Sequence, residues 1–393
     1  MSTSARMPLA SANAPVCVTG LRTFMQRVGN RPRLLVRIDT DAGISGWGEA
    51  YNHGPDLALT PVLDYLFELI RGLDARRVEH ISTILLRSAR FPQGAIGLAA
   101  ISAIDHALWD IAGKAAGLPV YMLLGGQVRD RIPVYCGLYD APDVGECLDR
   151  AHQAHDDFGF TSFKLSPYRR TPHDTRWGLV CREAGDYLGA LRVAAPSDWE
   201  FAFDAHAKIF EPIKALQLAD ALAPYDPLFL EEPLRPEHIP AWRDLRARMR
   251  IPLATGESLY SPYEFLALLS AGGADIVQPD ICVVGGLSQM RKIATIAEAH
   301  FVPVAPHNPM GPLATAHNVH FAAATTNFAY LEYKPAATSW CPDPYLPRDG
   351  HLELRPDRPG WGVEIDENAL AEDHYVRWER RLPVRPDGSV AFV

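Results

Sequence analysis

The chain has 393 residues, which exceeds one average domain and suffices for a large buried core. Its 48% hydrophobic and 22% charged residues are typical of an ordinary globular protein. The net charge of −9, with no block of Lys or Arg, argues against nucleic-acid binding, and no apolar run approaches the roughly 18 residues of a membrane span. Six scattered cysteines without metal-ligand spacing, and an N-terminus without a signal-peptide core, predict a cytoplasmic protein with free thiols.

Residues 1–130 predict an N-terminal α+β unit. Three β-rich runs between residues 15 and 51 suggest a β-meander, with a polar loop at Gln26–Arg33 and a hairpin turn at Asp41-Ala42-Gly43. From about residue 55 the apolar positions recur at helical spacing, most regularly over Ile96–Leu118. Two adjacent glycines at 125 and 126 then indicate a domain boundary.

The sequence pattern becomes repetitive after this boundary, where short β-rich runs alternate with amphipathic helical stretches. The eight β-rich runs are 132–139, 161–165, 199–205, 227–232, 251–257, 274–280, 302–307 and 328–333. This alternation predicts an α/β fold in which residues 131–339 form a (β/α)8, TIM-like barrel. The Pro- and Gly-rich tail, residues 340–393, is too long for a last barrel helix, and we expect it to pack back on the N-terminal unit.

Polar or charged side chains end seven consecutive strands of this predicted barrel. They are Lys164, Asp204, Glu231, Glu257, Asp280, His307 and Glu332, and from Asp204 onward they are 23 to 27 residues apart. Because this spacing is about one βα unit, these residues should lie at one height around the carboxyl-terminal mouth of the barrel, where such folds place their active sites.

Three carboxylates, Asp204, Glu231 and Glu257, end adjacent strands. Their mutual repulsion would be costly without a cation, so they predict a site for a hard divalent metal, best fitted by Mg²⁺. Strand alternation predicts that the neighbouring Glu232 points away from the mouth and has a supporting or structural role. Which of the two glutamates binds the metal depends on the strand register, which favours Glu231 with Glu232 as the alternative.

Asp280 and His307 end two further neighbouring strands. A carboxylate beside an imidazole fixes its tautomer and raises its pKa, so His307 is predicted to be a general base. Across the mouth, Lys164 could neutralise a substrate carboxylate or developing negative charge, and His206 could donate a proton to a leaving group. Ser166 and Glu332 are further hydrogen-bonding candidates, Glu332 either on an enolic oxygen or to orient the substrate.

Several motifs agree with a known family. They are Asp204, Glu231-Glu232-Pro233, Gly256-Glu257, Gln278-Pro279-Asp280, Pro306-His307, and the helix segment 104–111 (IDHALWDI) with Leu124-Gly125-Gly126. With them the whole chain resembles the enolase superfamily, within its mandelate racemase-like group. The resemblance implies an N-terminal capping domain, a modified (β/α)7β barrel, and Mg²⁺-assisted removal of a proton α to a carboxylate.

The sequence differs from the racemases of this group in one informative place. Racemases carry Lys-x-Lys after the second barrel strand, whereas this chain has Lys164-Leu165-Ser166 and lacks the second lysine. It has Asp204-Ala205-His206 instead, an arrangement similar to that of galactonate and mannonate dehydratases, where the histidine is the general acid. The resemblance therefore favours β-elimination of water from a sugar acid such as galactonate, gluconate or mannonate.

Two other functions remain open from the sequence. A racemase, epimerase or cycloisomerase would use the same enolate with different proton delivery, and a metal-binding scaffold without catalysis would keep the carboxylates alone. For substrate binding we expect the cap loop Phe24–Arg33 with Arg27, the turn with His53, and Tyr168 and Trp340 near the mouth. The expected partner is a small sugar acid, and relatives suggest a homo-oligomer, either a dimer or an octamer.

Overall fold

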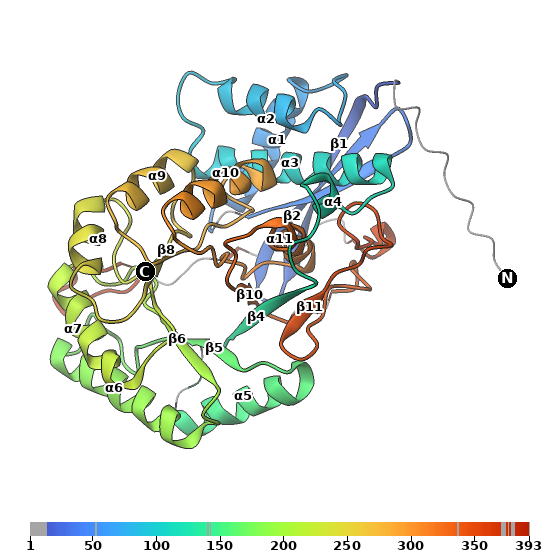
Figure 1. Ribbon diagram of the computed structural model, residues 1–393. Helices are drawn as coiled ribbons and strands as arrows, with labels where there is room; N and C mark the ends of the chain where they lie inside the picture. The colour runs from blue at the N-terminus through green and yellow to red at the C-terminus, as the bar shows by residue number, and fades with distance from the viewer. Residues whose placement is uncertain are drawn as a thin grey trace.

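The computed structural model describes residues 14–51, 53–139, 141, 143–335, 338–370, 375, 377–378 and 382–392. These residues form a three-stranded antiparallel sheet and a curled, mostly parallel sheet. Figure 1 shows the first sheet and its helices, in blue to teal, lying above the parallel sheet and the helices around it. The observed architecture is that of a modified TIM barrel with a capping domain, as predicted.

The cap consists of the antiparallel sheet and the helices beside it. Its elements are β1 Val18–Val28, β2 Arg31–Thr40, β3 Ser45–Ala50, the 3₁₀ helix η1 Asp56–Ala58, α1 Leu59–Glu68, α2 Val78–Arg87, α3 Gly94–Ala116 and α4 Val120–Leu123. The β-meander is confirmed, but the predicted loop at Gln26–Arg33 is wrong. Val28 pairs with Arg31, so only Gly29 and Asn30 form the turn, and Gly29 provides the positive φ of 60° that so short a turn needs.

Helix α3 is the central element of the cap and lies where the sequence predicted a helix. Strand β3 packs directly on it: a Cβ atom added at Gly46 or Gly48 would lie 2.0 Å from a carbonyl oxygen of α3. Only glycine permits this approach between the two backbones. By length and composition α3 could cross a membrane, but 78% of its apolar window is buried inside the protein, as expected of a core helix.

The barrel strands run in sequence order around the curled sheet, and each except the last, β10, is followed by a helix. The elements are β4 Arg131–Gly137, α5 Val144–Phe158, β5 Ser162–Leu165, α6 Trp177–Ala194, β6 Glu200–Asp204, α7 Pro212–Leu222, η2 Ala223–Tyr225, β7 Leu230–Glu231, α8 Ile239–Arg246, β8 Leu253–Thr255, α9 Pro262–Ser270, β9 Ile276–Val277, α10 Gly286–Ala299, α11 Pro312–Ala324 and β10 Leu331–Tyr333. Of the predicted strand 302–307, only Val304 pairs, with Val277 on one side and Phe328 on the other. This single residue closes the ring, since β10 pairs with β4.

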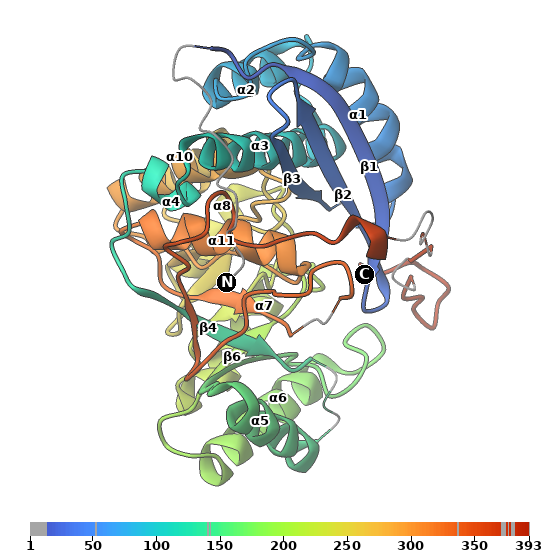
Figure 2. The same ribbon diagram turned by 90° about the vertical axis from the view of Figure 1, so that its right-hand side faces the viewer.

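The tail contacts both the barrel and the cap (Figure 2). Strand β11, His351–Glu353, pairs antiparallel with β4, and η3, Glu367–Ala369, brings Glu367 into ion pairs with Arg22 and Arg37 of the cap sheet. The Trp361 indole donates to the backbone oxygen of Trp47 at 3.2 Å. The tail thus joins the two parts, while the domain boundaries near residues 130 and 340 stay predictions.

Candidate active site

Three carboxylates meet at the carboxyl ends of β6, β7 and β8. Asp204 is the last residue of β6 and pairs in register with Glu231, the last residue of β7. Glu257 follows two residues after β8. One carboxylate oxygen from each of the three lies within 4.8 Å of the other two. The strand register therefore brings together the three predicted metal ligands.

The Lys164 side chain is fully buried and contacts two members of this carboxylate triad. Its Nζ is 2.7 Å from Glu231 Oε1, 3.1 Å from Glu332 Oε1 and 3.6 Å from Asp204 Oδ2. Burial opposes its charge, but Glu231 and Glu332 raise the pKa of Lys164 well above its usual value. The second Glu231 oxygen accepts from Gln278 Nε2 at 2.6 Å. Because Lys164 is held by carboxylates and does not line the cavity described below, its contact with substrate stays a prediction.

The donor set fits a hard divalent cation. Burial, and repulsion among the acids, raise the pKa values of Asp204 and Glu231. A cation bound to these oxygens would remove this cost, and an all-oxygen donor set is the one that Mg²⁺ prefers.

His307 lies at one end of the triad and is held by Asp280. Its Nδ1 is 2.8 Å from Asp280 Oδ2 and its Nε2 is 3.3 Å from Glu257 Oε2. Since a carboxylate only accepts, Nδ1 carries the proton of this hydrogen bond, and Nε2 is the nitrogen directed to the cavity. Burial works against the charged ring, but Glu257 and the bond to Asp280 outweigh it and raise the pKa of His307 to about 10. Because Glu257 contributes most to this rise, a cation held by Glu257 would offset it and let Nε2 accept a proton.

His206 lies at the other end of the triad. The chain leaves β6 in the left-handed region, with φ of 51° at His206, and the Nε2 atom lies 3.2 Å from Asp204 Oδ2. Its ring is in edge contact with that of Tyr139, with centroids 5.3 Å apart. The two predicted proton-transfer histidines therefore flank the carboxylates from opposite ends.

Tyr139 also connects His206 to Glu332. The Tyr139 hydroxyl donates to Glu332 Oε1 at 2.9 Å, and the Asn308 backbone N–H donates to Oε2 at 3.0 Å. Burial would favour the neutral acid, but Lys164 and these donors lower the pKa of Glu332 to about 2. Glu332 is therefore ionised and accepts hydrogen bonds, which favours orienting a substrate hydroxyl over donating to an enolic oxygen.

A cavity of about 1010 Å³ opens above these groups, between the barrel mouth and the cap. Of the predicted site residues, His53, Ser166, Asp204, His206, Glu257, Asp280, His307 and Glu332 line it. Five further lining residues are cationic: Arg31, Arg33, Lys208, Arg235 and Lys334. Carboxylates thus occupy the strand ends, while basic side chains come from the cap and from the loops around the mouth.

Three predicted substrate-binding residues do not line the cavity, which corrects the sequence-based prediction. Trp340 is only 3% exposed and packs within the tail, where its oxygen accepts from the Asp366 N–H. The Tyr168 hydroxyl donates to the Ala205 carbonyl, and Arg27 Nε donates to Gly29 O within its own hairpin. Proximity along the chain to a strand end did not determine where these side chains go.

Two residues that line the cavity, Tyr139 and Arg33, were not predicted from the sequence, and a third, Glu232, was predicted to point away from it. Tyr139 follows the first barrel strand, whose end was not considered, and applying the strand-end rule there would have found it. Glu232 lines the cavity, contrary to prediction, because its φ of 38° breaks strand alternation. Arg33 lines the cavity from the interior of β2, within what was expected to be a loop.

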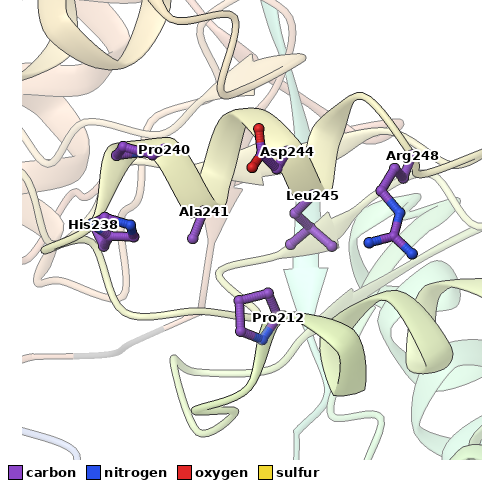
Figure 3. A pocket seen from close by; sticks show the side chains of 7 residues that line it. All are labelled: Pro212, His238, Pro240, Ala241, Asp244, Leu245 and Arg248. Atoms are coloured by element: carbon purple, nitrogen blue, oxygen red, sulfur yellow. The ribbon is translucent and has the colours of Figure 1, made fainter.

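A second, smaller pocket of about 300 Å³ lies on the outside of the barrel between α7 and α8 (Figure 3). It shares no lining residue with the cavity at the barrel mouth. Its charged side chains, Asp244 and Arg248, are exposed, so we assign no function to it.

Known proteins resemble the chain along nearly its whole length. The family model "Mandelate racemase / muconate lactonizing enzyme, N-terminal domain" matches residues 11–125, and "Enolase C-terminal domain-like" matches residues 146–369. A D-galactonate dehydratase from Verminephrobacter eiseniae is 36% identical over 91% of this chain and 96% of that protein.

Two solved structures extend this similarity. An enolase from Agrobacterium radiobacter, provisionally called a galactarate dehydratase and bound to Na and L-malate, is 56% identical, with a TM-score of 0.94 over 96% of this chain and 100% of that one. An enolase from Pantoea ananatis with bound D-gluconate and Mg is 27% identical, with a TM-score of 0.88 over 96% and 99%.

Proposed function

Because the chain belongs to the mandelate racemase/muconate lactonizing enzyme group of the enolase superfamily, as its motifs predicted, we propose that it is a Mg²⁺-dependent sugar acid dehydratase. The observation that carries this proposal is the placement of two imidazoles at the two ends of one carboxylate triad. One is held as a base by Asp280, and the other is positioned as an acid. Removal of a proton and departure of a hydroxyl need one group of each kind.

Asp204, Glu231 and Glu257 would hold the Mg²⁺ ion, as the clustered oxygens allow. When bound, the cation supplies positive charge to the substrate carboxylate and to the enolate that forms from it. The Mg bound with D-gluconate in the Pantoea ananatis enolase supports this choice of metal.

His307 takes the proton from C2 of the substrate through Nε2, while Asp280 keeps the ring in the required tautomer. The electrons of the C2–H bond enter the enolate. His206 then gives a proton to the 3-hydroxyl, so that the C3–O bond breaks and water leaves. The resulting enol becomes a 2-keto-3-deoxy acid. Glu332 orients a substrate hydroxyl, and the Lys164 ammonium stabilises the negative charges of Glu231 and Glu332.

The basic residues that line the cavity bear on whether the substrate has one carboxylate or two. Arg31, Lys208, Arg235 and Lys334 also line the cavity, and their positive charge would suit a second carboxylate, although Arg235 is paired with Glu237. L-malate, bound in the Agrobacterium radiobacter enolase, is itself a dicarboxylate. Sugar diacids therefore belong beside galactonate, gluconate and mannonate among the candidate substrates.

The test is a screen of purified protein with Mg²⁺ against C4–C6 aldonates, aldarates and their lactones, in H₂O and in D₂O. We expect a 2-keto product lighter than its substrate by one water. A product of unchanged mass, or exchange at C2 without loss of water, would instead establish the cycloisomerase or racemase alternative. Titration of Mg²⁺ without turnover on any acid would support the non-catalytic scaffold.

Location in the cytoplasm and assembly into a dimer or octamer remain part of this proposal. Both rest on the family resemblance and on the composition of the chain. Light scattering on the purified protein gives the oligomeric state directly.

A further inference from the structure

A carboxylate of the cap lies at the start of a barrel helix. Glu49, near the end of β3, is fully buried. Its Oε1 accepts from the Gly311 N–H and its Oε2 from the Ala314 N–H, both at 3.0 Å. These amides belong to the N-terminus of α11, where Gly311 occupies the capping position but has no side chain to cap with. Glu49 therefore supplies from another domain the cap that α11 lacks.

The contact leaves little room for adjustment. A Cβ atom added at Gly311 would lie 2.9 Å from both Glu49 carboxylate oxygens. On the other side, Gly48 precedes Glu49 and lies against the α3 backbone, so β3 has no space to withdraw. Glu49 is thus pressed between the centre of the cap and the start of α11.

Arg33 adds a second contact to the same barrel segment. Its Nη2 donates to the Pro309 carbonyl at 2.9 Å, and its Nε lies 3.6 Å from Glu49 Oε1. Arg33 is only 1% exposed, and its guanidinium stacks over the Tyr51 ring at 4.5 Å. Two neighbouring cap strands therefore hold the segment 309–314 at both ends.

This segment directly follows the residue we assign as the base. His307 and Pro309 are two residues apart, and both line the cavity with Arg33. The intervening Asn308 is fixed by Glu332 through its N–H and by Thr315 of α11 through its side-chain amide. A shift of the α11 N-terminus would therefore be passed to the His307 backbone.

We propose that Glu49, supported by Arg33, is a positioning residue through which the cap aligns His307 for proton removal. The role given to His307 rests on the proposed function. A base displaced by about 1 Å can lose on the order of 10²-fold in rate, so a contact that touches no substrate can control turnover.

The chain offers a matched control for the test. Asp110 of α3 is also a buried carboxylate that accepts two backbone N–H groups across the fold, from Trp47 at 3.0 Å and Trp361 at 3.1 Å, beside a basic partner, Lys114. Within the part of the chain that the structure describes, Asp110 forms no hydrogen bond or ion pair with the segment 309–314. Glu49→Gln and Asp110→Asn each remove one carboxylate. In each variant the amide oxygen can accept one of the two backbone N–H groups, but the amide NH₂ faces the other and repels it.

We expect Glu49→Gln to lower kcat by about ten- to a hundred-fold while KM changes by about two-fold or less. Asp110→Asn should lower the melting temperature comparably but leave kcat within about two-fold of the wild type. Amide hydrogen exchange in peptides spanning 308–316, measured without substrate, should accelerate only in Glu49→Gln. Gly311→Ala, whose φ of −82° tolerates alanine, tests the same contact from the other side and should also lower kcat.

Unchanged kcat in Gly311→Ala, or equal losses of kcat in Glu49→Gln and Asp110→Asn, would overturn the positioning role. If Glu49→Gln does not fold, Gly311→Ala decides the question alone. Wild-type protein inactive on every acid would refute the proposed function, whereas the exchange measurement would still decide whether Glu49 holds the segment.

Discussion

The site contains two histidine–aspartate pairs, which differ in their surroundings. His307 is bonded at 2.8 Å to Asp280, whose other oxygen accepts from the Cys282 N–H. Asp280 is not part of the triad. His206 lies 3.2 Å from Asp204, which is one of the three clustered carboxylates. One imidazole thus has a carboxylate of its own, and the other shares its carboxylate with the proposed cation site.

This difference separates the two proposed roles. Asp280 can stay with His307 throughout the reaction and keep Nε2 available as an acceptor. Asp204 would also bind the cation, which would weaken its interaction with His206. A permanent partner suits a base that must be aligned, while a shared partner suits an acid that must give up its proton.

The strongest test of the comparison is His307→Asn. We expect loss of both C2 exchange and dehydration, with kcat lowered by about 10⁴-fold or more, because no other group replaces the base. The measurement is product formation, with C2 exchange in D₂O and circular dichroism as controls. A folded variant with substantial turnover would show that the Asp280-held imidazole is not the base.

Weakening the proposed cation site, of which Asp204 is part, should lower turnover by a similarly large factor. Glu257→Ala takes one ligand from the triad and should abolish turnover and weaken Mg²⁺ binding, measured by calorimetry. Chelation of the wild type should remove activity, and added Mg²⁺ should restore it. Full activity after complete chelation would disprove the metal-dependent part of the mechanism.

His206→Asn distinguishes the two pairs most directly. Dehydration should fall by about 10²-fold, because the leaving hydroxyl loses its acid, while C2 exchange in D₂O continues through His307. Nuclear magnetic resonance follows both processes in one sample. Equal loss of exchange and dehydration would contradict the division of roles.

The smallest effect on turnover is expected at a buried carboxylate whose hydrogen bonds come from an uncharged partner. It serves as a comparison for the two histidine–aspartate pairs, since here burial is the largest cause of the shift in the pKa of the acid. Asp105 of α3 accepts from the N–H and hydroxyl of Ser288 in α10, and burial raises its pKa to about 7. The folded state therefore binds this proton more tightly than the unfolded chain, and the resulting stability, complete below about pH 4, is lost as the pH rises through 7.

Asp105→Asn should remove this loss. The free energy of unfolding of the variant, relative to wild type, should rise between pH 4 and 7 by at most about 1.4 kcal/mol per pH unit and be constant above. Urea unfolding at several pH values measures it. Parallel curves for the two proteins would contradict the raised pKa.

The strand-end residues were predictable because the period of a βα unit places them without knowledge of distant contacts. Asp204, Glu231 and Glu257 followed from this spacing, and so did the neighbouring Asp280 and His307. Residue type then suggested the chemistry. A single sequence is therefore enough to predict the residues whose position depends only on the repeat of the βα unit.

Residues outside this period were not predictable. Glu232 enters the cavity because of one positive φ value, which no residue type near it announces. Trp340 was assigned to the mouth from its position after Glu332, but the tail buries it. Glu49 contacts α11 across more than 260 residues of chain, a pairing that local patterns do not encode.

The closure of the barrel at Val304 has a mechanical consequence. Val304 has one paired residue on each side, Val277 and Phe328, whereas β5 and β6 share four paired residues. Backbone hydrogen bonds join the segment 303–306 to Val277 on one side and to Asn327, Ala329 and Glu332 on the other. His307, the proposed base, lies three residues beyond this single-residue bridge. Arg33 and Glu49 contact the chain at residues 309–314, just beyond this bridge, so the cap is placed to support the barrel wall as well as to cover its mouth.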